Sequence, residues 1–490
     1  RRYTTAAPPR GVLIPFLLHR AAWGDSSSRA APVMRRTASV GIAIRSAGAL
    51  LALALACAPV APARAGDAGS PCSCGDGVAC GEGVGCRAGG GICDWLGGPA
   101  ANPCSGCGPG FCGQLVTPAG GCASGIETFW FRGDYLRWDR SGVELPPLVT
   151  TSPLGVPGPQ QGILGLGTTT IAAGDLTIGD GWRHGFALEG GFWIDPHAGF
   201  ALALDYFNAG RDSYGARVGN DNQFVARPFF DTQLGVQRAR ILNAPGELNG
   251  GVGVSAFDDF QGAGAWLQKC VWHRGNGCTT DGGARVSLLG GYRYYHQDSL
   301  VYIREDYEAL AGNTFGRPTG ELHVAADKFA GRNEFHGLEI GVQGRLQRCR
   351  WWCEGLAMVA LGGSRRVVFV EGSTINFDPM LGADAEQGAL LTSGITNFGR
   401  YTDDQAQAIP RFRLGGGCQL TERLSARAGY SVIIWNNVVQ AADHLPTGLA
   451  VDPRNLPTIA PGGGPEPAFP GIRDRRMVAH GLDFGLELWF

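Results

Sequence analysis

The chain has 490 residues, among them 79 glycines, 12 tryptophans and 23 phenylalanines, and its formal net charge is −2. A charge this close to zero gives no electrostatic reason to expect nucleic acid or an acidic partner. The high glycine and aromatic content, with few helical patterns, favours an all-β protein over a helical one.

The N-terminal region does not read as part of a fold. Residues 1–33 look like a non-native upstream extension, because Met34 opens a basic start that leads into an apolar run at 46–56 and a small-residue cleavage site ending at Ala65. That order is typical of a secretory signal peptide, and the run is too short to cross a bilayer as a helix. We therefore predict a signal peptide over 34–65 and export of the mature chain.

Residues 66–125 form a Cys- and Gly-rich segment that we predict to be periplasmic. Its cysteines are Cys72, Cys74, Cys80, Cys86, Cys93, Cys104, Cys107, Cys112 and Cys122. Only Cys104 and Cys107 make a C-x-x-C pair, and zinc would need a second pair at suitable spacing. Because disulfides form in exported chains, we favour disulfides over a metal site here.

The remaining residues, 126–490, alternate apolar and polar side chains in segments of about ten residues or a little more, the length of a tilted membrane-crossing strand. We predict strands at 127–138, 182–194, 199–209, 252–269, 284–296, 333–347, 352–362, 409–420, 423–436 and 476–490. The predicted fold is a closed antiparallel transmembrane β-barrel of about 10 strands, or 12 if 213–230 or 364–372 adds a hairpin.

The connections between these strands alternate between short turns and long loops. The long ones are 139–181, 210–251, 297–332, 363–408 and 437–475. Outer-membrane barrels have short periplasmic turns and longer extracellular loops, so we place the long loops outside the cell. The final strand is expected to close the ring against the first.

Several tryptophans fall at or near the predicted strand ends: Trp138, Trp193, Trp272, Trp351, Trp352, Trp435 and Trp489. Aromatic girdles at the two membrane interfaces would place them there, and we predict such girdles.

The polar faces of the strands carry charges that we predict to line the lumen. They are Arg183, Glu189, Arg293, Glu339, Arg345, Arg411, Arg413, Arg427, Asp483 and Glu487. These groups either form a charged constriction or pair across the interior and fill it. Side chains fill a barrel of about eight strands, whereas aqueous porins use about sixteen to eighteen, so the predicted strand number favours a narrow or plugged path.

The other mature cysteines lie at the predicted short-turn ends: Cys270, Cys278, Cys349, Cys353 and Cys418. We predict that Cys270–Cys278 and Cys349–Cys353 staple turns. Because the barrel and the Cys-rich segment each hold an odd number of cysteines, full pairing would need a bridge between them, and Cys418 is the candidate.

No catalytic or cofactor site is expected. His184, His296, His336 and His480 are scattered over different strands without a Ser or Asp at a catalytic spacing, and isolated strand histidines are usually interfacial or lumen-facing. The acids of 258–259 and the charges of 304–306 are expected to be solvated loop or rim groups, not metal ligands.

Some short stretches carry a family resemblance: FWFRGDYL at 129–136, LPPLVTTSP at 145–153, ARPFF at 226–230 and HGLDFGLE at 480–487. With these, the chain resembles the outer-membrane β-barrel proteins of planctomycete bacteria named beta-barrel porin family seven. The resemblance runs from about residue 126 to 490. It implies an outer-membrane barrel and a terminal aromatic, Phe490, that the barrel-insertion machinery reads.

We therefore expect a non-enzymatic protein of the cell outer membrane. The leading expectation is a narrow passive channel for small solutes. The alternative is a structural or surface-interaction barrel that anchors long extracellular loops without transport. The expected partners are outer-membrane lipid and the barrel-insertion machinery, with no cofactor and no nucleic acid. The sequence leaves the solute and the oligomeric state open.

Overall fold

The computed structural model describes residues 129–195, 199–219, 222–274, 283–348, 350–421, 423–457 and 463–490. The predicted upstream extension, signal peptide and Cys-rich segment lie outside these residues. Within them, no helix is long and apolar enough to span a membrane.

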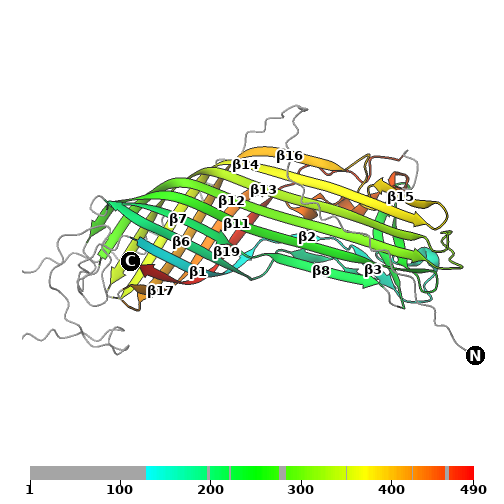
Figure 1. The fold of residues 1–490 in the computed structure, drawn as a ribbon, viewed down its shortest axis with the longest axis horizontal. Coiled ribbons are helices and arrows are strands. Elements are labelled where there is room, and N and C mark those ends of the chain that lie inside the picture. Colours follow the sequence, from blue (N-terminus) through cyan, green and yellow to red (C-terminus); the bar gives the residue numbers. More distant parts are fainter. Residues whose placement is uncertain are drawn as a thin grey trace, which may run out of the picture.

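Ten antiparallel strands pair side by side into one closed ring (Figure 1). In ring order they are β1 (Phe129–Arg140), β6 (Arg183–Asp195), β7 (Phe200–Asn208), β11 (Leu248–Arg274), β12 (Gly283–Ala309), β13 (Leu322–Arg348), β14 (Trp351–Asp378), β16 (Gly399–Gln419), β17 (Leu424–Val438) and β19 (Arg475–Trp489). The predicted fold is confirmed, and each ring strand contains most of one predicted strand. The ring stays at ten because 213–230 forms strands outside it and 364–372 lies within β14.

The ring closes between its first and last strands, as predicted. Trp130 stands opposite Trp489, and the backbone N–H of Phe490 donates to the carbonyl oxygen of Phe129 at 2.9 Å. This pairing leaves no open edge on β1 or β19. A closed ring is one of the two ways in which a chain satisfies all its backbone polar groups in lipid.

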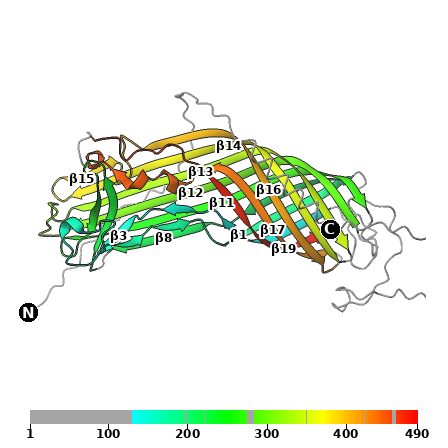
Figure 2. The ribbon, with the colours of Figure 1, turned by 180° about the vertical axis from the view of Figure 1, so that it is seen from behind.

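The long extracellular connections are more regular than we predicted. Strands β11, β12 and β13 each run for 27 residues and β14 for 28, far beyond the length needed to cross a bilayer. Most of 297–332 and 363–408 is therefore strand, which corrects the prediction of loops there. Figures 1 and 2 show these strands as a curved wall that continues past the barrel.

The predicted strands are too short because the apolar residues move from the outer to the inner face partway along each long strand. In the barrel part of β12, Leu288 and Tyr292 point outward and are exposed while Arg293 points inward. Further along the same strand, Val301 and Ile303 are the buried inward side chains. Water replaces lipid as the outer solvent at this height, so the apolar side chains move to the inner face. The predicted strands therefore end where the apolar residues leave the outer face.

Smaller elements extend this wall or fill its concave side. They are β2 (Val143–Leu145), β3 (Val149–Ser152), η2 (Gly158–Gln160), β4 (Thr170–Ala173), β5 (Leu176–Ile178), β8 (Asp212–Gly219), β9 (Phe224–Asp231), β10 (Val236–Asn243), β15 (Gly382–Gln387), η3 (Ala441–His444), η4 (Thr447–Leu449), β18 (Ala450–Val451) and η5 (Pro453–Asn455). Strands β8 and β15 extend the wall at β11 and β14, while β10, β9, β3, β4 and β18 form a second sheet. One apolar core joins that sheet to the wall, including Phe229, Ile303 and Val368. We call this part the extracellular domain.

The tryptophan girdles that we predicted are largely wrong. Of the seven predicted residues, five are buried inside the ring and two, Trp272 and Trp351, are exposed; the buried ones are Trp138, Trp193, Trp352, Trp435 and Trp489. Each buried tryptophan lies on the inward face of its strand, as Trp138 does two positions from Leu136. The exposed aromatics of the outer wall are mainly phenylalanine and tyrosine, such as Phe131, Tyr135 and Phe484.

The change of sides along the strands predicts different costs for the same substitution. Ile340→Lys, on the outer face of β13, should cost about 2–4 kcal/mol because the lysine is placed in hydrocarbon. Thr402→Lys, exposed on β16 at the height of the extracellular domain, should change stability by less than about 0.5 kcal/mol. The free energy of unfolding in lipid vesicles, measured with denaturant, tests both variants. Equal costs would contradict the assignment of lipid and water to the two heights.

Candidate functional site: the interior of the barrel

The ring interior holds the charged side chains that the sequence singled out. Nine of the ten are buried, and Arg413 is nearly so with a side chain 9% exposed. They come from β6, β12, β13, β16, β17 and β19. Arg293, Glu339 and Arg411 form a smaller group of ion pairs, and Arg183, Arg427 and Asp483 have other partners. Ion pairs join the remaining four, Glu189, Arg345, Arg413 and Glu487, into the main network.

Arg132, which we did not predict, is at the centre of this network. Its guanidinium contacts Glu487 at 3.0 Å, Glu189 at 3.1 Å and Glu354 at 3.2 Å. These acids come from β19, β6 and β14, so one arginine on β1 connects strands around much of the ring. Arg132 and Glu354 both lie at inward positions of alternating segments, and extending the alternation to every predicted strand would have identified them.

Further ion pairs extend the network. Arg413 bridges Glu189 and Glu354, each at 3.2 Å, and Arg345 contacts Glu487 at 3.2 Å. Arg427 contacts Asp134 at 3.5 Å. These pairs are almost dry, so their attraction must offset a large desolvation penalty. Glu189, Glu354 and Glu487 meet it by facing more than one arginine each, whereas Asp134 faces only Arg427.

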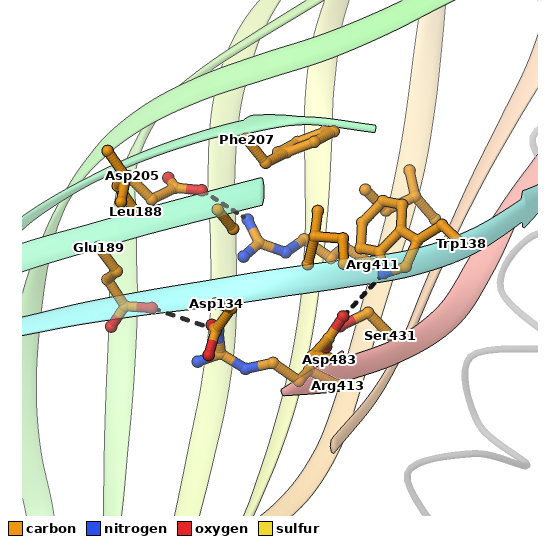
Figure 3. Close-up of a pocket in the computed structure, with 13 residues that line it drawn as sticks. Asp134, Trp138, Leu188, Glu189, Asp205, Phe207, Arg411, Arg413, Ser431 and Asp483 are labelled. Atoms are coloured by element: carbon orange, nitrogen blue, oxygen red, sulfur yellow. Dashed lines mark hydrogen bonds and ion pairs between the residues drawn. The ribbon is translucent and has the colours of Figure 1, made fainter. Parts of the chain in front are cut away.

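A second group of pairs lies beside the first. Arg293 contacts Glu339 at 2.7 Å and Asp205 at 2.9 Å, and Arg411 contacts Asp205 at 3.3 Å. Asp483 has no arginine partner and accepts a hydrogen bond from Trp138 Nε1 at 2.7 Å. Figure 3 shows Arg411 pointing to Asp205, Arg413 to Glu189 and Trp138 to Asp483.

Positive and negative groups balance at this height. The arginines are Arg132, Arg285, Arg293, Arg345, Arg411, Arg413 and Arg427, and the acids are Asp134, Glu189, Asp205, Glu339, Glu354, Asp483 and Glu487. Seven arginines and seven acids give no net formal charge at this height. The arrangement is that of a filled interior, which was one of the two possibilities that the sequence left open.

An aromatic layer crosses the lumen above the charges. Trp435 on β17 lies 6.0 Å from Phe260 on β11 and 5.9 Å from Tyr295 on β12, measured between ring centroids. Strands β11 and β17 stand on opposite sides of the ring, so these contacts span the lumen. Phe207 and Phe335 complete the layer, and both are fully or almost fully buried.

A small cavity of about 30 Å³ remains between the charged network and the aromatic layer. Its lining includes Asp134, Asp205, Arg411 and Asp483. That volume holds about two water molecules. Asp134 Oδ1 is buried without a hydrogen-bond partner among the described residues, so water in this cavity would satisfy it.

The extracellular end of the lumen is covered by the connection from β17 to β19. Asn333 holds its first residues: the Nδ2 group donates to the carbonyl oxygen of Val439 at 2.8 Å, and Oδ1 accepts from the Val439 N–H at 2.9 Å. Arg183, the predicted lumen charge outside the main network, lies nearby at 3.9 Å from Asp258. Asp258 is buried in β11 and also pairs with Arg140, so it is not the solvated charge that we expected.

The extracellular domain contains a separate buried ion network. Arg227 contacts Glu305 at 2.8 Å and Asp327 at 2.7 Å, and Arg240 contacts Glu305 at 3.2 Å. Glu305 is fully buried in β12, which corrects the expectation of a solvated loop charge. Burial opposes ionisation of this carboxyl, but Arg240 and Arg227 hold its pKa well below the usual value.

The structure tests the cysteine predictions only in part. Cys270 is disulfide-bonded, while its predicted partner Cys278 lies outside the described residues. Cys349 also lies outside them, so the Cys349–Cys353 staple stays a prediction. Cys418 carries a free thiol, and the segment to which we predicted it would be tied is not described.

The central role of Arg132 predicts a large effect of its removal. Arg132→Met should lower the free energy of unfolding by about 3–5 kcal/mol, because Glu189, Glu354 and Glu487 keep their burial but lose a cation. Denaturant unfolding in vesicles measures the loss. Arg423→Met, at an exposed turn, is the control with little expected effect. The double variant Arg132→Met/Glu487→Gln should recover part of the loss, and a full additive loss would contradict the network.

The low pKa of Glu305 predicts acid sensitivity of the extracellular domain. Its stabilising contribution is complete above the unfolded carboxyl pKa of about 4.3 and is lost as pH falls through the lower folded value. Hydrogen exchange of β9 and β12 should therefore accelerate below about pH 4.3. Glu305→Gln should flatten this dependence, whereas Glu308→Gln, exposed on the same strand, should not. Identical profiles for both variants would exclude Glu305 as the acid-sensitive group.

Comparisons with known proteins place the chain in a family. Residues 130–490 match the model of the beta barrel porin-7 family, BBP7. No curated protein matches. Among solved structures, the outer membrane protease OmpT from Escherichia coli is 8% identical with a TM-score of 0.33, over 74% of this chain and 97% of that one.

A FadL homologue from Pseudomonas aeruginosa is 11% identical with a TM-score of 0.17, over 74% of this chain and 89% of that one. Likenesses this weak carry no argument about activity. The family match covers the ring from its second residue onward and, apart from Phe129, includes the stretches that carried the resemblance in the sequence. This outer-membrane β-barrel chain belongs to the beta barrel porin-7 family.

Proposed function

We propose that this protein is a closed, non-conducting outer-membrane barrel that anchors an extracellular domain at the cell surface. The observation that carries the proposal is the contact of Trp435 with Phe260 and Tyr295 across the lumen. A continuous water path would have to pass through this layer, and the aromatic side chains are packed there without exposure.

The charged network supports the same conclusion. Selective pores leave rings of like charge facing water, whereas Arg132, Arg293 and their partners are neutralised and dry. The strand number agrees, since a ring of ten strands is closer to the filled barrels of about eight strands than to porins of about sixteen.

The extracellular domain is packed together with the strands that leave the barrel. Its wall is continuous with the barrel strands, and its inner sheet shares one core with the wall. Met380 and Leu381, at the turn between β14 and β15, are 93% and 89% exposed. Apolar side chains presented in this way favour contact with another surface, which supports an interaction role.

A narrow passive channel for small solutes is the second candidate. The cavity beside Arg411 and Asp205 favours it, because it is a polar space inside the lumen. Passage would require the aromatic layer to move. We rank this candidate second because Trp435 and Phe260 are packed between the cavity and the extracellular end.

We further propose that the protein has no enzymatic role, is exported by its signal peptide, and has outer-membrane lipid and the insertion machinery as its partners. In the part of the chain that the structure describes, no group of three His, Cys, Asp or Glu residues could hold a metal ion. Phe490 is exposed at the end of the chain, where an insertion factor can reach it.

Planar-bilayer recording separates the two candidates. The purified protein should show no steady ion current, because the aromatic layer and the paired charges block the path. A steady current that falls when Arg411 and Arg413 are replaced by alanine would establish the channel instead.

A widened variant provides the positive control. Trp435→Ala combined with Phe260→Ala and Tyr295→Ala removes the layer while it leaves the ion pairs in place. We expect brief, small currents from this variant only. A wild type that conducts as well as the widened variant would overturn the proposal.

A further inference from the structure

Tyrosines on the outer wall repeat one arrangement on several strand pairs. The phenol oxygen contacts Nδ1 of a histidine in the pairs Tyr135–His184, Tyr292–His336 and Tyr430–His480. A fourth pair, Tyr206–Gln261, has a glutamine in place of the histidine. In each case the partner lies two residues beyond the position opposite the tyrosine, toward the extracellular end.

The arrangement determines which ring nitrogen faces the surroundings. A phenol is the better donor and a neutral imidazole nitrogen the better acceptor, so the tyrosine O–H donates to Nδ1 at 2.6 Å for His336 and 2.7 Å for His480. Nε2 must then carry the proton. Each histidine therefore has an N–H donor that the tyrosine does not use.

Two of these histidines flank one arginine. Arg137 on β1 stands opposite His184 on β6, and on its other side it stands opposite Leu482, with His480 two residues further up that face. Diagonal neighbours at this offset are within reach of long side chains. Arg137 is exposed, and among the described residues it makes no ion pair within 4.0 Å.

The surroundings of Arg137 match the edge of a bilayer. On the same outer face lie the exposed apolar side chains of Leu482, directly opposite it, and of Phe186 and Phe484 below it. The acid nearest in register is Asp139, opposite His480, whose Oδ1 accepts the backbone N–H of Gly181 at 2.9 Å. One charged donor and two imidazole donors thus lie at the edge of an apolar band.

We propose that Arg137, His184 and His480 form a binding site for the phosphate headgroup of an outer-leaflet lipid. The guanidinium supplies the charge, the two Nε2–H groups supply directed donors, and the apolar band receives the acyl chains. Tyr135 and Tyr430 are positioning residues that fix the histidine tautomers. The site rests on the outer-membrane barrel itself and does not depend on whether the lumen conducts.

The experiment uses the folded, delipidated barrel in detergent and two short-chain lipids, dihexanoyl phosphatidic acid and dihexanoyl phosphatidylcholine. Native mass spectrometry counts bound lipid during a titration. The wild type should bind phosphatidic acid about tenfold more tightly than phosphatidylcholine, because a bare phosphate accepts charge-assisted hydrogen bonds. Arg137→Ala should abolish that preference.

A matched control removes the same charge elsewhere on the outer wall. Arg365 is exposed on β14, but it stands between Glu334 and Asp404, so Arg365→Ala should keep the preference. If both variants lost the preference for phosphatidic acid equally, the preference would come from general surface charge, and the proposed site would be wrong. Mobility of the unheated protein on gels verifies folding, and Arg137→Gln replaces the alanine variant if that one fails to fold.

Two further arms test the tyrosines and the lipid source. Tyr135→Phe with Tyr430→Phe should weaken phosphatidic acid binding about threefold, while Tyr206→Phe, whose partner is a glutamine, should not. Inorganic phosphate at the same concentration should not compete, since it has no chains for the apolar band. Full competition by inorganic phosphate would show a site for free phosphate and contradict the lipid assignment.

Discussion

Closure of the ring between β1 and β19 is the constraint on which the rest of the structure depends. Once Phe490 pairs with Phe129, every barrel strand has two neighbours and no edge remains. The strand number then fixes the width, and the width fixes how much side-chain volume the interior accepts. In a ring of ten strands, inward side chains from opposite walls meet, so each must find a partner of matching chemistry.

The interior meets this requirement in layers. Charged side chains pair with opposite charges around Arg132, and aromatic side chains pack around Trp435. A buried arginine is costly alone, and a tryptophan in a wet lumen would lose most of its packing. The two chemistries also meet: the Arg293 guanidinium lies 5.5 Å from the centroid of the Trp266 ring. A further buried apolar cluster inside the ring includes Trp130.

The character of the outer face of these strands depends on whether it meets lipid or water. Up to the level of Tyr292 and His336 the outer wall is apolar, and beyond it the inner face becomes the apolar one. Long strands thus cross from lipid to water without a break and continue into the extracellular domain. The tyrosine–histidine pairs lie near this change of sides, where hydrocarbon gives way to polar headgroups.

The sequence by itself determined the ring. Strict alternation at 338–346 and 482–488 gave strand positions, their number and the facing of Ile340, Asp483 and Phe484, because side-chain direction in a strand depends only on parity. It also identified most of the inward charges but missed five of them, which lie at inward positions of the same alternating strands: Arg132, Asp134, Asp205, Arg285 and Glu354.

Only the tertiary structure decided which inward groups meet and what surrounds the strands. Parity places Trp435 on the inner face but does not say that Phe260 lies across from it, since that contact depends on ring closure and register. The alternation also does not reveal whether a face meets water, lipid or protein. Glu305 was therefore predicted to be an exposed charge, although it is fully buried in the core. The alternation in the sequence determines to which face of the strand a side chain points. Which groups surround that side chain depends on how the strands pair in the closed ring.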